Sequence, residues 1–272
     1  MINTIPIANL DDPRLHPYLT LRRPLEHQQN GIFVAEGNKV VERLLESDLR
    51  ILSVLLTPEW LEKYRTILEA RPERFEVYVG PKNLLHTIVG FHLHQGVMAV
   101  ANIPAPEGLE HLLSRSSEPY LLVAVEGLTN SENLGVLVRN CVAFGAQGLL
   151  VGETSSSPYL RRAVRNSMGT IFKLPVIQCS SLRDDLATLH RNYGVRTIAA
   201  HPSARSHVLT QSDFTKSCCL VFGNEGGGIS GGILEVCDEL VAIRMDAGVD
   251  SLNVASASAV FLNEVRRQRE EE

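Results

Sequence analysis

Residues 120–151 of this 272-residue chain read YLLVAVEGLTNSENLGVLVRNCVAFGAQGLLV, and they decide the fold expected for its second part. An unbroken apolar run, typical of a strand buried on both faces, precedes a helical pattern and a second apolar run. Asn130 or Ser131 can cap the helix, which should run to about Phe144 and end at Gly145. The stretch therefore predicts a strand–helix–strand unit with parallel strands.

The same alternation continues to the end of the chain. Apolar runs predict further strands at 172–178, 196–202, 218–224 and 239–245, and amphipathic patterns predict helices at 159–169, 182–194 and 253–269. Such an order predicts a mostly parallel α/β sheet covered by helices on both faces. In sheets of this kind, ligands bind at the carboxyl ends of the strands.

The first part of the chain also alternates helical and strand patterns. We expect helices over 33–47 and 60–70, and strands over 51–57, 75–80 and 96–102. The stretch IPAPEGLEHLLSRSSEP (103–119) is rich in Pro, Gly and Ser, which is typical of a linker. The sequence thus predicts two α/β domains, a smaller one over residues 1–103 and a larger one over 120–272, with a linker at 104–119.

Composition excludes several classes of protein. With 44% hydrophobic and 21% charged residues, the chain is not disordered as a whole. It has neither an apolar run long enough to span a bilayer nor a signal peptide, so we expect a cytoplasmic protein without a membrane partner. Its five cysteines include no CxxC pair and indicate buried thiols in a reducing compartment.

The charge distribution points to a phosphate-bearing partner. A net charge of -5 argues against a protein that coats nucleic acid by bulk charge. However, the stretch from Thr154 to Arg183 contains no acidic residue. Arg161, Arg162 and Arg165 lie close together on the helix expected there, either as solvated surface residues or, as we favour, as contacts to RNA phosphates. His92 and His94 share a strand face but have no third ligand nearby, so no metal site is predicted.

The glycine-rich loop LVFGNEGGGISGG (220–232) allows three interpretations. Gly226, Gly228 and Gly231 satisfy the GxGxxG pattern of NAD-binding oxidoreductases, but only about 40 residues follow the loop, too few for the rest of a dinucleotide-binding fold. Alternatively, the glycines simply permit a tight turn. Glu225 favours a third interpretation, because a carboxylate at the end of a strand can accept hydrogen bonds from a ligand or orient an arginine.

Three ordered segments together resemble a known family. They are ENLGVLVRNCVAFGAQGLLV (132–151), LVFGNEGGGIS (220–230) and IRMDAGVDSLNVASASAVFLNEV (243–265). They look like the three motifs of the SpoU (TrmH-type) family of RNA ribose 2′-O-methyltransferases, of the SPOUT class. In the first domain, FVAEGNKVVERLL (33–45) and HLHQGVMAVA (92–101) resemble the L30e-like substrate-binding domain that precedes many members.

This resemblance implies a cofactor, a topology and partners. The cofactor would be S-adenosylmethionine, held in loops tied as a trefoil knot, mainly through the backbone of Gly223, Ile243 and Leu252. The RNA would be ribosomal or transfer RNA, and the chain would form a homodimer through its C-terminal domain. One departure is Arg244, which stands where the family usually has proline.

The resemblance also implies catalytic residues. Asn133 and Arg139 match the first motif, Glu225 the second, and Ser251 and Asn253 the third. We expect Arg139 to grip the adjacent phosphate and to stabilise negative charge developing on the ribose oxygen. The two asparagines and Ser251 would position the hydroxyl and the loops, and Glu225 would orient Arg139 or a loop amide. A catalytically silent RNA-binding relative remains the alternative.

Overall fold

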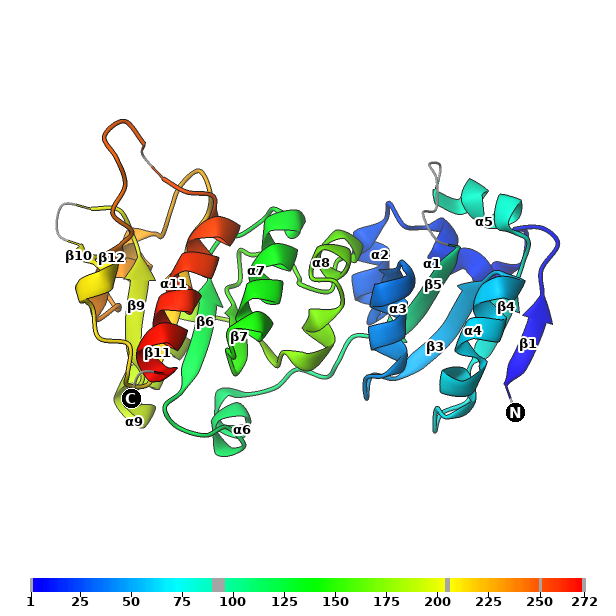
Figure 1. Cartoon of the computed structure of the whole chain (residues 1–272), viewed down its shortest axis with the longest axis horizontal. Helices are drawn as coiled ribbons and strands as arrows, with labels where there is room; N and C mark the ends of the chain where they lie inside the picture. Colours follow the sequence, from blue (N-terminus) through cyan, green and yellow to red (C-terminus); the bar gives the residue numbers. More distant parts are fainter. Residues whose placement is uncertain (1, 90–95, 204–205, 250, 271–272) are drawn as a thin grey trace. The chain divides into compact units, whose positions relative to one another are not determined.

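Short apolar segments form two separate sheets, each with its own buried core. The structure is a computed structural model that describes residues 2–89, 96–203, 206–249 and 251–270. Contacts divide it into two compact units, drawn in Figure 1. The first unit comprises the residues up to Ala105 together with Tyr159–Phe172, and the second comprises Pro106–Pro158 and the residues from Lys173 onward.

The first unit contains a mixed five-stranded sheet in the order β1-β4-β3-β5-β2. Its strands are β1 (Asn3–Pro6), β2 (Ile32–Glu36), β3 (Ile51–Leu56), β4 (Glu76–Val79) and β5 (Val97–Asn102), of which β5 runs antiparallel to β3 and β2. Its helices are α1 (His16–Leu19), α2 (Pro24–Gln29), α3 (Asn38–Leu45), α4 (Pro58–Glu69), α5 (Lys82–Val89) and α8 (Arg161–Asn166). The side chain of Phe33 packs against Tyr159 and Phe172, which explains why the α8 segment groups with this unit.

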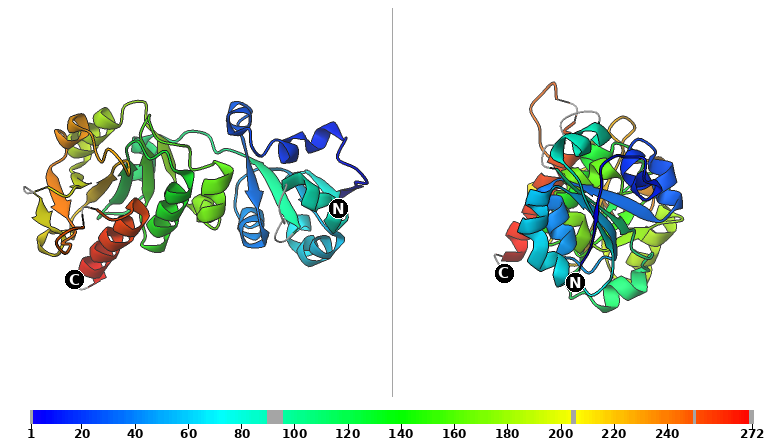
Figure 2. Two further views of the ribbon diagram at one scale, coloured as in Figure 1. Left: turned by 90° about the horizontal axis from the view of Figure 1, so that it is seen from above. Right: turned by 90° about the vertical axis from the view of Figure 1, so that its right-hand side faces the viewer.

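The second unit contains a seven-stranded parallel sheet in the order β10-β12-β9-β11-β6-β7-β8, which confirms the parallel α/β prediction. Its strands are β6 (Leu121–Val125), β7 (Gly148–Val151), β8 (Val176–Gln178), β9 (Arg196–Ala200), β10 (His207–Val208), β11 (Cys218–Phe222) and β12 (Glu239–Ala242). Its helices are α6 (Leu109–Ser114), α7 (Ser131–Ala143), α9 (Leu182–Tyr193), α10 (Gly231–Leu234) and α11 (Val254–Glu270). Figure 2 shows α7 and α11 together on one face of this sheet and α9 on the other.

Three local expectations differ from the structure. The strand expected over 172–178 is β8 only from Val176 on, because Thr170–Lys173 forms a 3-10 helix. The helix expected over 33–47 is wrong in its first part, because Ile32–Glu36 forms a fully buried strand and α3 starts only after Gly37, whose φ is 95°. Leu109–Ser114, within the stretch expected as a linker, forms α6. The side chains of Leu112 and Leu113 in this helix are buried in the core of the second unit.

The remaining general expectations can be compared with the described residues. All five cysteines are free thiols, and burial raises the pKa of Cys218 to about 11, so its thiol stays protonated at neutral pH. No helix among the described residues is both long and apolar enough to cross a membrane. No three potential metal ligands come together in the described part of the chain, and His92 and His94 lie outside it.

Candidate functional site

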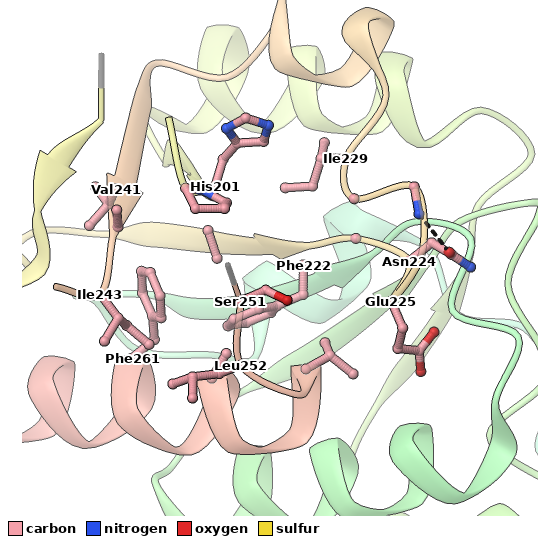
Figure 3. Close-up of a pocket in the computed structure, with 18 of the residues that line it drawn as sticks. His201, Phe222, Asn224, Glu225, Ile229, Val241, Ile243, Ser251, Leu252 and Phe261 are labelled. Atoms are coloured by element: carbon pink, nitrogen blue, oxygen red, sulfur yellow. Dashed lines mark hydrogen bonds between the residues drawn. The ribbon is translucent and has the colours of Figure 1, made fainter. Parts of the chain in front are cut away.

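A cavity of about 320 Å³ opens at the carboxyl ends of β9, β11 and β12 in the second unit (Figure 3). These strand ends form one side of it, and the start of α11 with the segment before it forms another. The volume lies within the range of pockets that bind small organic ligands. Five of the residues predicted from the sequence line the cavity: Gly223, Glu225, Ile243, Ser251 and Leu252.

The loop from Gly223 to Gly228 is closed by its own hydrogen bonds. The backbone amides and carbonyls of Asn224 and Gly228 bond to each other at 3.0 and 2.9 Å. The side-chain oxygen of Asn224 accepts from the amides of Gly226 and Gly227 at 2.7 and 3.0 Å, and its amide group donates to the carbonyl of Gly127. Asn224 therefore shapes the loop and ties it to the end of β6, a role that the sequence did not predict.

These bonds decide between the interpretations of the glycine pattern. The amides of Gly226, Gly227 and Gly228 all donate to acceptors within the loop. A dinucleotide fingerprint needs such amides free to meet a pyrophosphate at the start of a long helix. The helix that follows here, α10, has only four residues. The NAD-binding interpretation is therefore not supported.

Replacing Asn224 with alanine removes all three side-chain bonds of the loop. We expect the variant to lose about 1–3 kcal/mol of stability, because the partner groups would lose their hydrogen bonds. Asn224→Asp keeps the acceptor oxygen but loses the donor to Gly127, so its stability should lie between those of the wild type and Asn224→Ala. Thermal unfolding of the three proteins tests this, and an unchanged Tm for Asn224→Ala would contradict the bracing role.

Gly223 has no room for a side chain. A Cβ at this position would lie 2.5 Å from the amide nitrogen of Ile229 and closer still to the carbonyl group of Gly228. All of these are backbone atoms and cannot move aside as a flexible side chain would. The closed loop therefore requires glycine here for close approach, rather than for an unusual φ.

A chain of hydrogen bonds joins one residue from each of the three sequence motifs. The side-chain amide of Asn133, in the first turn of α7, donates to the carboxylate of Glu225 at 2.6 Å. The side-chain oxygen of Asn133 accepts from Asn253 at 3.1 Å. The oxygen of Asn253 in turn accepts from the amide of Ala255 at 2.9 Å and so caps α11. The structure thus brings these three predicted residues together at the edge of the cavity, and it pairs Glu225 with Asn133 rather than with Arg139.

A second asparagine fixes α7 against α11. Asn140, seven residues after Asn133 on the same face of α7, donates to the carbonyl of Ala255 and to the hydroxyl of Ser258. The sequence also did not predict this role of Asn140 in holding α7 against α11. Arg139 lies next to Asn140 but is exposed, and its side chain has no hydrogen bond or ion pair within the described residues. Its guanidinium is therefore available to an anion from outside the chain.

The predicted basic helix lies in the first unit. Arg161 pairs with the buried carboxylate of Glu36 at 2.5 Å, and Arg165 lies 3.8 Å from the same residue. Arg162 is exposed. Two arginines of the acid-free stretch are thus partly neutralised by a carboxylate from β2. Binding of RNA phosphates by this helix stays a prediction.

His201 is a further cavity residue that the sequence motifs did not predict. It follows β9 and lines the cavity, and Figure 3 shows its imidazole at the rim opposite Leu252. Its Nδ1 is buried and has no hydrogen-bond partner among the described residues. A buried polar atom without a partner costs about 1–3 kcal/mol, so a polar ligand atom that bonded to it would be stabilised.

Two known protein-family models together match most of the chain. The model described as the SpoU rRNA Methylase family matches residues 120–263. A second model, described as RNA 2′-O ribose methyltransferase substrate binding, matches residues 34–107.

Individual proteins are similar over almost the whole chain. A Mycobacterium bovis protein described as an uncharacterized tRNA/rRNA methyltransferase is 30% identical over 269 residues, which cover 96% of this chain and 91% of the relative. The crystal structure of an AdoMet-bound rRNA methyltransferase from Sinorhizobium meliloti is 25% identical, with a TM-score of 0.84 and coverage of 97% and 98%. That of the SpoU methyltransferase AviRb from Streptomyces viridochromogenes with AdoMet is also 25% identical, with a TM-score of 0.83 and coverage of 96% and 100%.

Proposed function

This chain belongs to the SpoU rRNA methylase family, and from this premise we propose that it transfers a methyl group from S-adenosylmethionine to a ribose 2′-hydroxyl of ribosomal or transfer RNA. The observation that carries the proposal is the hydrogen-bonded chain Glu225–Asn133–Asn253. It joins the three family motifs at the cavity, which is the arrangement that a shared active site requires. The same intact motifs argue against a catalytically silent RNA-binding relative.

The cavity suits the cofactor. Apolar side chains of Ile229, Leu252 and Phe261 line it, and they favour an adenine ring. Gly223, Ile243 and Leu252 all line it, and no amide or carbonyl group of theirs makes a hydrogen bond within the described part of the chain. These backbone groups can therefore hold the adenosine part, and the unpaired Nδ1 of His201 offers a further polar contact.

The bound cofactor supplies an electrophilic methyl group on a sulfonium, so no metal is needed for transfer. The protein must align the ribose oxygen with that methyl group, and alignment supplies much of the rate. Arg139 would bind the adjacent phosphate and stabilise the negative charge that develops on the oxygen. Arginine keeps its proton at neutral pH, so this role is electrostatic rather than that of a base.

The other motif residues would hold the two loops in place. Asn133 uses its donor on Glu225 and its acceptor on Asn253, so its contacts serve the loops rather than the RNA directly. Ser251 is exposed and lines the cavity, where its hydroxyl can contact the ribose. These residues would thus shape the pocket before RNA arrives.

The proposal extends to assembly, topology and substrate contact. We propose that the second unit forms the homodimer and carries the trefoil knot of the family, and that the enzyme works in the cytoplasm. We further propose that Arg161, Arg162 and Arg165 contribute positive charge to RNA binding. Such contacts position RNA without reading its bases.

Cofactor binding separates the methyltransferase from the oxidoreductase alternative. In a calorimetric titration, the protein should bind S-adenosylhomocysteine with micromolar or tighter affinity and should not bind NADH, because the loop amides are already occupied. Binding of NADH without S-adenosylhomocysteine would overturn the proposal. Transfer of tritiated methyl groups to ribosomal and transfer RNA would then separate an active enzyme from a silent relative.

A further inference from the structure

A second cavity, of about 310 Å³, lies in the first unit and is rich in arginine. It is lined by Leu19–Arg23, between and around α1 and α2, by Thr87 and Ile88 of α5, and by Arg161 of α8. Among the described residues, no acidic side chain lines it. We call this site the arginine cavity. Its three arginines come from two segments far apart in the sequence, Arg22 and Arg23 from one and Arg161 from the other. Folding therefore brings together positive charges that the composition does not reveal.

The guanidiniums of the arginine cavity are only partly neutralised. Arg22 is exposed and has no ion pair or hydrogen bond within the described residues. Arg23 is also exposed and lies 3.6 Å from Glu26, too far for a close hydrogen bond. Arg161 is held by Glu36, which also lies near Arg165. The three arginines of the cavity, together with the nearby Arg165, thus have two carboxylates as partners, which leaves an excess of positive charge.

The hydroxyl groups of the arginine cavity are already used. Thr20 donates to the carbonyl of His16, and Thr87 donates to that of Leu84. The unpaired donors facing a ligand are therefore mainly guanidinium groups, whose planar forks match phosphate oxygens. Arg161 is held in place by Glu36, which fixes one of these groups before a ligand binds.

We propose that the arginine cavity binds a backbone phosphate of the RNA substrate. This inference rests on the proposed function and adds a binding site that includes Arg22 and Arg23. Because the available groups are guanidiniums and apolar side chains, the cavity would fix the position of the RNA but would not read its sequence. Part of the affinity for RNA would then depend on salt and not on base identity.

The test compares two pairs of exposed arginines in the same unit. Arg22→Gln with Arg23→Gln removes two charges from the arginine cavity, and Arg65→Gln with Arg74→Gln removes two charges elsewhere. Filter binding of labelled ribosomal and transfer RNA should weaken about ten-fold in the first variant and less than two-fold in the second, for whichever RNA the wild type binds. The slope of log affinity against log salt should fall by about one to two in the first variant only.

Several outcomes would overturn the inference. They are equal losses in the two variants, no loss in the first variant, or binding of neither ribosomal nor transfer RNA by the wild-type protein. Adenosine monophosphate provides a further arm: micromolar binding that only the first variant loses would assign the cavity to a free nucleotide instead. S-adenosylhomocysteine affinity is measured in parallel, and its absence in the wild type would refute the methyltransferase proposal without touching the arginine cavity.

Discussion

Arg139→Ala is expected to lower methyl transfer about 10²–10³-fold, as removal of a group that stabilises developing negative charge does in other enzymes. The affinity for S-adenosylhomocysteine should stay within two-fold of the wild type. The side chain of Arg139 is exposed and makes no hydrogen bond or ion pair with a described residue, so its removal breaks no polar contact that holds the fold. It lies six residues after Asn133, about 9 Å further along α7, and so it is separate from the loop network.

The measurement is single-turnover transfer of tritiated methyl groups to RNA, with calorimetry for the cofactor product. Arg191→Ala serves as the matched control, because Arg191 is an exposed arginine in the last turn of α9 in the same unit. Its turnover should match that of the wild type. Equal turnover of Arg139→Ala and the control would remove Arg139 from the mechanism, and loss of cofactor binding would mean that Arg139 is structural.

Gly223→Ala is expected to weaken binding of S-adenosylhomocysteine at least 100-fold. The added Cβ would meet the backbone of Gly228 and Ile229, so the loop must open. Opening moves the cavity wall and breaks the bonds between Asn224 and Gly228. Overpacking of this kind typically costs about 1–3 kcal/mol, and more where only backbone can yield.

Gly227→Ala is the matched control for this loop. A Cβ at Gly227 would meet no atom within 4 Å, and the amide of Gly227 keeps its bond to Asn224. This variant should therefore bind the cofactor product within two-fold of the wild type and unfold at a similar temperature. If both alanine variants bind alike, the close approach at Gly223 is not what shapes the cavity.

The sequence predicted the second unit well because its signals are local. Apolar runs buried on both faces mark parallel strands, and Asn130 caps α7 as expected, with its side chain accepting from Glu132 and Asn133. Residues 33–36 were misassigned as helix, because a short apolar run before a helix has no period of its own. The structure shows that the glycine of the turn, Gly37, separates the strand from the helix.

The site was predicted by resemblance more than by pattern. The quoted motifs contain Asn133, Glu225 and Asn253, but no spacing says that Asn133 joins the other two. Asn224 was missed because its function depends on the curvature of the loop around it. The arginine cavity was also missed, since Arg22 and Arg161 become neighbours only after the first unit has folded.

The order of strands in the second sheet has a consequence for how the enzyme is made. Strand β6 pairs with the central strand β11, so that Leu121 lies opposite Cys218, and β11 leads directly into the glycine loop. Pairing between such distant segments raises the contact order and slows folding. During synthesis, β6 leaves the ribosome long before β11 has been translated. The cofactor pocket must therefore be one of the last parts of the nascent chain to fold.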